Sequence, residues 1–292
     1  MLIMLIRKLP GGTPAVLALS IVVAVAGLGH PLQDQQVPAK LTADLVKTGL
    51  YVISGGGGNS LVRLSANGLI VVDGKLPGNY EELVALTKKI SFSDQPIRIL
   101  ITTDHHAEHT GNNSNFIADG VHILAHENVK QNLGASKAGG DALKTYEREF
   151  TVRLGGIEAR LMHFGNAHTN GDTVVYFPNL KVVAIGDLFG AIPNPDFSAG
   201  GSLLGWGPVL AEVLKLDFDV AVPGAGPPVT KADVVAFKNK IDSLISRATS
   251  LVEKGVAKDQ LMARLKTDDL GWRFSFTPNQ LDAFYAELSR RK

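Results

Sequence analysis

Cysteine is missing from the 292-residue chain. Its absence excludes disulfide bonds, thiolate metal ligands, a cysteine nucleophile and a lipid anchor attached to cysteine. Net charge is also nearly absent, because 29 Lys and Arg side chains offset 28 Asp and Glu side chains and leave a formal charge of +1. Without a strong positive field, the chain is not expected to bind nucleic acid or an anionic membrane surface. A content of 45% hydrophobic and 20% charged residues is that of an ordinary globular protein.

The first 29 residues have the layout of a secretory signal peptide. The basic pair Arg7 and Lys8 precedes an uncharged run, Ala15 to Gly29, whose only polar side chain is Ser20. The triplet Ala24-Val25-Ala26 supplies the small residues at which such segments are cleaved. A permanent membrane anchor is the alternative, although a span needs about 20 apolar residues. We therefore expect an exported protein, periplasmic or secreted, that contacts a membrane only if this segment is not removed.

The remaining chain is predicted to consist of a linker, residues 30–45, and one domain, residues 46–292. Strands are expected where Val-, Ile- and Leu-rich runs are bounded by turn residues, and helices where apolar residues recur every three to four positions. The predicted strands are 50–54, 60–65, 69–72, 97–102, 121–125, 150–154, 157–163, 173–177, 182–185 and 220–222. Helices are predicted at 80–90, after 127, and at 203–216, 231–253, 260–265 and 279–290, so they dominate from about residue 230; 134–141 is predicted to be a mobile loop. This order fits two sheets packed face to face with helices outside, but does not exclude a doubly wound sheet.

Residues Asp104 to His109 form the most informative segment. Five of these six side chains (Asp104, His105, His106, Glu108 and His109) can bind a metal or transfer a proton. They directly follow an apolar strand, so they should emerge together at a sheet edge. Imidazole and carboxylate donors without sulfur suit zinc, iron or manganese. A polar loop with hydrogen-bonding histidines is the alternative, but the density of donors favours metal binding or catalysis.

Two later segments each place one further donor at the end of a strand. His168 lies in Gly165 to Asp172, between two predicted strands, and Asp187 follows Ile185-Gly186. Taken singly, His168 could be a turn residue and Asp187 a helix cap.

Together, the three segments resemble the metallo-β-lactamase superfamily. Its pattern is a His-x-His-x-Asp-His loop, a His-Thr-x-Gly-Asp segment, an Asp in Gly-Asp and a final His in Pro-Gly-His-Gly. Asp104 to His109, His168 and Asp187 match the first three elements in order, and Pro223 to Pro227 matches the fourth. The resemblance implies an α/β fold, a four-layer αββα sandwich of two mixed β-sheets flanked by helices. It also implies that Asp73, after the strand at 69–72, supports the site.

The chain departs from the family pattern at three positions. Asp104 replaces the first His, Glu108 replaces the Asp, and Ala225 replaces the final His. By carry-over, one metal would be bound by Asp104, His106 and His168, and a second by Glu108 and His109, with Asp187 bridging. The second site is then one ligand short, and His105 and His163 are possible substitutes.

The resemblance implies one or two divalent metal ions, with zinc expected and manganese or iron as alternatives. The third carboxylate weakens the positive field at the metal and shifts preference away from zinc.

The implied function is hydrolysis of a small-molecule ester, lactone, amide or related substrate by a metal-bound hydroxide. Glu108 or Asp187 would act as the general base. The alternative is a degenerate member of the fold that binds a ligand or metal without turnover. Oligomeric state is left open, and the fold does not identify the substrate.

Overall fold

The computed structural model describes residues 40–91, 95–134 and 142–290. The predicted signal segment, the linker up to residue 39 and the predicted loop at 135–141 lie outside the described residues. Residues 38–292 form one compact unit. Within its described part, no helix is both long and apolar enough to span a membrane.

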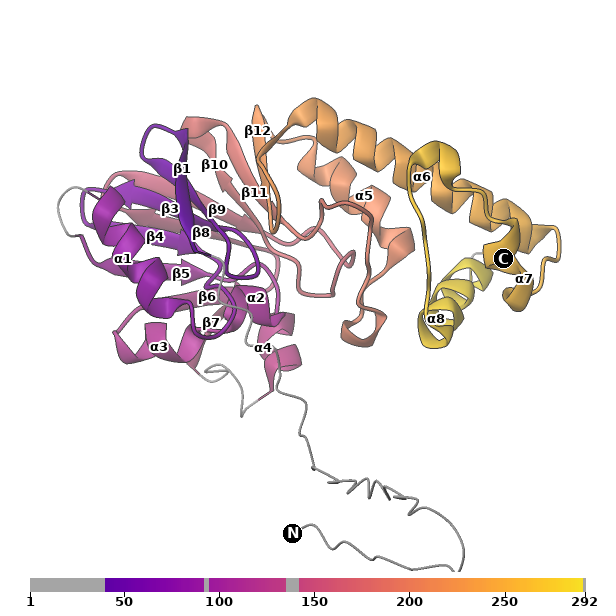
Figure 1. Ribbon diagram of the computed structural model, residues 1–292, viewed down its shortest axis with the longest axis horizontal. Helices are drawn as coiled ribbons and strands as arrows, with labels where there is room; N and C mark the ends of the chain where they lie inside the picture. Colours follow the sequence, from indigo (N-terminus) through magenta and orange to yellow (C-terminus); the bar gives the residue numbers. More distant parts are fainter. Residues whose placement is uncertain (1–39, 92–94, 135–141, 291–292) are drawn as a thin grey trace, which may run out of the picture. The chain divides into compact units, whose positions relative to one another are not determined.

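Two mixed sheets form the centre of this unit (Figure 1). In the described residues, the first sheet has the order β1-β2-β3-β4-β5-β6-β7 and the second the order β13-β12-β11-β10-β9-β8. The first contains β1 (Thr42–Lys47), β2 (Leu50–Ser54), β3 (Ser60–Ser65), β4 (Gly68–Val72), β5 (Ile97–Ile101), β6 (His122–His126) and β7 (Lys144–Tyr146). The second contains β8 (Glu149–Leu154), β9 (Ile157–Met162), β10 (Val174–Phe177), β11 (Val182–Gly186), β12 (Val220–Pro223) and β13 (Val229–Thr230).

Helices cover the outer face of each sheet. Those beside the first sheet are α1 (Tyr80–Ile90), α2 (Ala107–Thr110), α3 (Asn113–Ala118) and α4 (Glu127–Leu133). Those beside the second are α5 (Leu203–Val213), α6 (Lys231–Glu253), α7 (Lys258–Arg264) and α8 (Pro278–Ser289). Figure 1 shows α1 and α3 on the side of the first sheet and α5 to α8 on the opposite side.

The alternation of side chains along each strand builds three apolar layers. On β4, Ile70 and Val72 pack between the sheets, whereas Leu69 and Val71 pack under the helices of the first sheet. On β11, Val182 and Ala184 face the space between the sheets, and their neighbours face α5 and α6. Because successive side chains in a strand point to opposite faces, a fully apolar strand must be covered on both. The predicted four-layer αββα sandwich is confirmed.

Parallel strand pairs deliver the polar segments to one edge. Strand β4 is parallel to β5, and β11 is parallel to β12. Parallel strands end on the same side of a sheet, so Asp73 and the segment after β5 lie together, as do Asp187 and Gly224. A hydrogen bond from Thr173 N to Thr103 O joins the two sheets there, at 2.7 Å.

The predicted C-terminal boundary of the linker, residue 45, is wrong. Residues 42–45 belong to β1, which pairs with β2 at the edge of the first sheet. The strand was missed because both of its faces are largely exposed, so its sequence lacks the alternation of apolar and polar residues that indicates a strand.

Candidate metal centre

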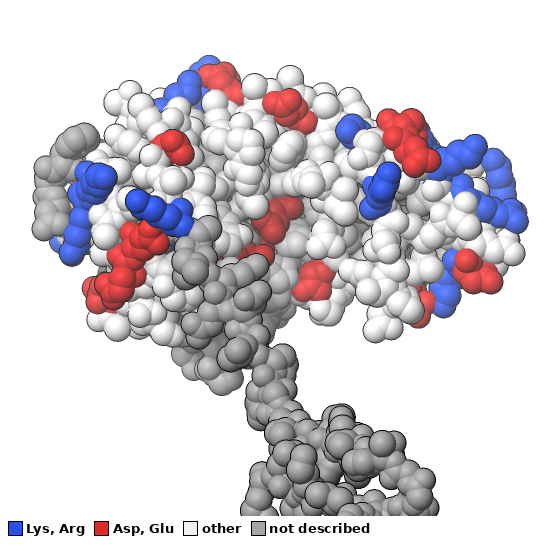
Figure 2. Space-filling model, in the orientation of Figure 1, with Lys and Arg blue, Asp and Glu red and all other residues white. Residues whose placement is uncertain are grey.

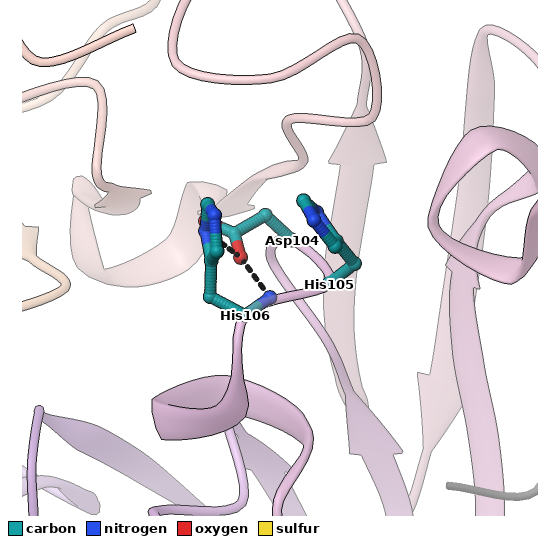
Figure 3. Close-up of side chains that lie close together, drawn as sticks. All are labelled: Asp104, His105 and His106. Carbon is teal, nitrogen blue, oxygen red and sulfur yellow. Dashed lines mark hydrogen bonds and ion pairs between the residues drawn. The ribbon is translucent and has the colours of Figure 1, made fainter. Parts of the chain in front are cut away.

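In the segment after β5, a tight local turn directs the side chains of Asp104, His105 and His106 (Figure 3). Asp104 is 1% exposed, and its Oδ1 accepts a hydrogen bond from the backbone N of His106 at 2.7 Å. Asp side chains commonly close such turns by bonding to the backbone two residues on. The same Oδ1 lies 3.1 Å from His106 Nδ1, so one carboxylate fixes both the turn and the ring. His106 is the N-cap of α2, which carries Glu108 and His109.

His109 is held from behind by Asp73. The His109 ring is fully buried, and its Nδ1 lies 3.0 Å from Asp73 Oδ2. Asp73 is fixed in turn, because its Oδ1 accepts from Thr103 N and its Oδ2 from Thr103 Oγ1, both at 2.8 Å. Asp73 also adopts a φ of 66°, a left-handed conformation that is uncommon outside glycine. Asp73 therefore contacts His109 on the side away from the other donors, as expected of a supporting residue.

The opposite nitrogen of His109 points at two carboxylates without bonding to either. Its Nε2 is buried, has no hydrogen-bond partner among the described residues, and lies 3.6 Å from both Asp104 Oδ2 and Asp187 Oδ1. A buried polar atom without a partner is costly and calls for an explanation. Two donors that each lie about 2.1 Å from one tetrahedral ion are separated by about 3.4 Å. The spacing therefore fits donors that share a cation.

His168 completes the convergence from the second sheet. Its Nε2 lies 3.2 Å from His106 Nδ1, 3.6 Å from Asp104 Oδ2 and 3.5 Å from Asp187 Oδ2. The ring is placed by the turn after β9, in which Asp172 accepts hydrogen bonds from Thr169 N and Oγ1. The two oxygens of Asp187 face different histidines, as a bridging ligand would.

Three donor groups can be formed within the described part of the chain. They are Asp104, His105 and His106; Asp104, His168 and Asp187; and Glu108, His109 and Asp187. In each group one donor atom per residue lies within 4.8 Å of the others. All six residues that the sequence assigns to the metals are thus brought together, with His105 beside them.

His163 is not part of these groups. Its ring stacks on that of His126 with centroids 3.9 Å apart, and its Nδ1 lies 2.9 Å from the carbonyl oxygen of Asp172. The structure therefore gives no support to His163 as a substitute ligand.

Position 225 is exposed, but the glycine before it is needed. A Cβ on Gly224 would meet Asp187 Oδ1 at 2.0 Å, so only glycine permits this close approach. Asn59 ties the turn to the glycine-rich hairpin, because its backbone N donates to Gly224 O at 2.7 Å.

Lys75, fully buried, donates to the carbonyl oxygens of Ile53 and Gly58 across the base of that hairpin. Burial lowers the pKa of Lys75 to about 7.

Charge in the cluster favours protons on His106 and His109 when no cation is bound. Burial disfavours ionisation of Asp104, yet His109 and the hydrogen bond from His106 hold its pKa well below the ordinary value. The same hydrogen bond raises the pKa of His106 to about 9. Burial opposes protonation of His109, but Asp104 and Asp73 raise its pKa well above the usual range. A cation would replace these protons. The middle of the face in Figure 2 carries acidic side chains with no Lys or Arg among them.

Two residues that the sequence did not indicate contact the histidines from outside. The carbonyl oxygen of Asn194 lies 2.7 Å from His168 Nδ1, and Asp196 Oδ2 lies 3.2 Å from His106 Nε2. Both lie in an irregular loop between β11 and α5, where no motif marks them. The only sequence signal is the Asp-x-Ser spacing of a capping residue at Asp196 and Ser198.

Comparison with known proteins settles the family. The model of the Metallo-beta-lactamase superfamily matches residues 54–225, which include all the donors. The chain belongs to this superfamily. Solved structures of similar fold include a metallo-beta-lactamase from Pontibacter korlensis and the metallo-beta-lactamase DIM-1. The first aligns with a TM-score of 0.59 at 18% identity over 69% of this chain and 99% of that one. The second aligns with a TM-score of 0.59 at 16% identity over 70% and 99%.

A curated relative is the 2,4-dinitroanisole O-demethylase subunit alpha of Nocardioides sp. (strain JS1661). It is 26% identical over 238 residues, which are 80% of this chain and 73% of the relative.

The departures from the superfamily pattern have a structural counterpart. Asp104, where the pattern has His, presents Oδ2 at 3.6 Å from both His109 and His168. A carboxylate can contact two ions, whereas a histidine in this place offers one nitrogen. Asp104 Oδ2 therefore lies as close to His109 Nε2 as to His168 Nε2.

Proposed function

We propose that the protein is a metal-dependent hydrolase of a small molecule. The observation that carries the proposal is the convergence of His109 and His168 on the carboxylates of Asp104 and Asp187 at 3.5–3.6 Å. His106 lies beside them, with its Nδ1 3.2 Å from His168 Nε2. Membership of a superfamily that includes hydrolases and the likeness to an enzyme subunit support it.

The residues present fit a divalent cation. His106 Nδ1 and His168 Nε2 would bind on one side, and Glu108 and His109 Nε2 on the other, with Asp104 and Asp187 between them. Nitrogen and oxygen donors without sulfur suit zinc, manganese or iron. When bound, such an ion polarises the reacting group of the substrate and makes a coordinated water more acidic.

Glu108 and Asp187 are the proposed general bases. Both belong to the donor group of His109, and both are partly exposed, so a proton can pass from the site to solvent. Asp104, fully buried and held at low pKa by its histidines, is poorly suited to accept one.

The substrate would enter beside His106 and His168. These residues line a cavity of about 540 Å3 together with the Asn194–Ser198 loop and side chains of the first turn of α8. This volume lies in the range of small-molecule sites. Amide and hydroxyl groups on these walls, from Asn194, Thr277 and Gln280, would bind polar groups of a substrate.

Cleavage of an aryl methyl ether is a second candidate reaction, favoured by the name of the curated relative. A degenerate protein that binds metal without turnover is the alternative from another class, since Ala225 removes a ligand of the superfamily pattern.

The test combines metal analysis with turnover. Purified protein should contain one to two divalent ions per chain by mass spectrometry. It should hydrolyse one member of a panel of chromogenic esters, lactones, a cephalosporin and 2,4-dinitroanisole, supplied with Zn²⁺, Mn²⁺ or Fe²⁺. His168→Ala should lose metal and turnover together, whereas His122→Ala, an exposed histidine on β6, should lose neither. Metal without turnover would favour the degenerate protein, and absence of both would end the proposal.

Export is a separate proposal from residues 1–29. N-terminal sequencing of the protein from the cell envelope or medium should find cleavage shortly after Ala26. An intact N-terminus in the membrane fraction would indicate an anchor.

A further inference from the structure

One short loop contacts the outer nitrogens of two metal-facing histidines. His168 Nδ1 lies 2.7 Å from Asn194 O, and His106 Nε2 lies 3.2 Å from Asp196 Oδ2. The inner nitrogens of the two rings, 3.2 Å apart, face the donor cluster. His105 Nε2 is 3.7 Å from the same oxygen of Asp196, which is beyond hydrogen-bond reach.

The orientation of the Asp196 carboxylate is fixed by its other oxygen. Oδ1 accepts from Ser198 N at 2.9 Å, from Ser198 Oγ and from Ala199 N at 3.2 Å. These three donors leave Oδ2 as the atom that faces His106. The loop is also tied to the histidine segment, because Asp196 N donates to His168 O at 2.7 Å.

We propose that Asp196 is a positioning residue that fixes the tautomer of His106. A proton on Nε2, donated to Asp196 Oδ2, leaves the lone pair of Nδ1 for a cation once that cation has displaced the proton that Nδ1 shares with Asp104 Oδ1, 3.1 Å away. Metal-binding histidines usually donate their other ring N–H to a carboxylate or carbonyl, and removal of that partner costs about 10–100-fold in metal affinity. The inference rests on the metal centre of the proposed function but not on hydrolysis.

Asp196→Asn is the most informative variant, because the side-chain amide cannot flip to exchange its oxygen and its NH₂ group. Its oxygen is retained by the three donors at Ser198 and Ala199, so its NH₂ must face His106 Nε2. This forces Nε2 to accept and moves the proton to Nδ1, where it blocks metal binding. Asp196→Ala removes the capping oxygen as well, but leaves His106 free to donate Nε2–H to water.

Two measurements should therefore rank the two variants in opposite order. Asp196→Asn should be the worse in metal binding, and Asp196→Ala the worse in stability. Zn²⁺ affinity, from competition with a chromophoric chelator, should fall about tenfold in Asp196→Ala, which removes the partner, and further, to about 100-fold, in Asp196→Asn. The unfolding midpoint of the metal-free protein should fall more in Asp196→Ala, which loses the cap. Ser198→Ala, which keeps the carboxylate, should retain zinc affinity within about threefold.

Nitrogen NMR of the zinc-loaded protein gives an independent readout. His106 Nε2 should carry the proton in the parent protein. A proton on Nδ1 there, unchanged zinc affinity in Asp196→Asn, or affinities that simply follow the metal-free midpoints would each overturn the assignment. Failure of the parent to bind zinc, manganese or iron at all would overturn the metal centre itself, a different result.

Discussion

The two ends of the donor cluster use the same device in different surroundings. At the buried end, His109 is backed by Asp73, which is held by Thr103 at the end of β5. At the outer end, His106 is backed by Asp196 on an irregular loop, with side chains about a quarter exposed (27% and 25%). A carboxylate on the outer ring nitrogen fixes the imidazole in both cases.

The surroundings decide what each pair contributes. The buried pair is part of the core, so its loss should affect folding as well as metal binding. The outer pair lies in partly solvated space, where water can replace a lost partner, so its loss should affect metal binding more than folding. The residues of the outer end, His106 and Asp196, also line the cavity.

The largest expected effect is common to both ends. His106→Ala and His109→Ala each remove a nitrogen donor, and each should reduce Zn²⁺ affinity by at least about 10³-fold, or roughly 4 kcal/mol. Equilibrium dialysis at fixed free zinc measures this. His122→Ala is the control. Parent-like affinity in either variant would mean that this end takes no part in binding.

Asp73→Ala should lower the stability of the metal-free protein far more than a substitution at the outer end does. It leaves the buried Thr103 N and His109 Nδ1 without their acceptor, and breaking a buried pair of this kind costs about 3–5 kcal/mol. Chemical denaturation of the metal-free protein should detect the loss, and Asp196→Asn should change the same quantity by less than about 1 kcal/mol. Equal losses in the two variants would contradict the comparison.

A pair of histidines outside the cluster supplies a pH test. Burial and the neighbouring His163 lower the pKa of His126 to about 4. Because this pKa is below the unfolded value of about 6.5, the contribution to stability is present above pH 6.5 and is lost as the pH falls toward 4. Between pH 7 and pH 5 the loss should be about 1–2 kcal/mol.

His126→Gln isolates this contribution. In the presence of a chelator, its free energy of unfolding should decline less between pH 7 and pH 5 than that of the parent. Parallel declines would show that His126 does not carry the dependence.

The short apolar runs predicted most of the strands, and the four-layer sandwich was implied by the family resemblance of the donor segments that follow some of them. The candidate donor residues could be predicted from the sequence because Asp104 to His109 is contiguous and because His168 and Asp187 stand in recognisable segments. The supporting residue Asp196 could not be predicted in this way, because it is 90 residues away from His106 in the sequence and meets it only through the folding of an irregular loop. His163, a possible substitute ligand by sequence, lies just after β9 and stacks on His126, a contact that its sequence position does not indicate.

The smallest expected effect concerns the missing ligand of the superfamily pattern. Ala225→His restores an imidazole beside Gly224, whose backbone approaches Asp187 closely. If Asp104 Oδ2 already serves the group of His109, to which it lies at 3.6 Å, the added histidine should strengthen the second equivalent of zinc by only about three- to tenfold, roughly 1 kcal/mol. Isothermal titration of the metal-free protein measures it, with Ala225→Gln as a control of similar size. A gain above about a hundredfold would show that Asp104 does not compensate and that the buried end holds its ion only weakly.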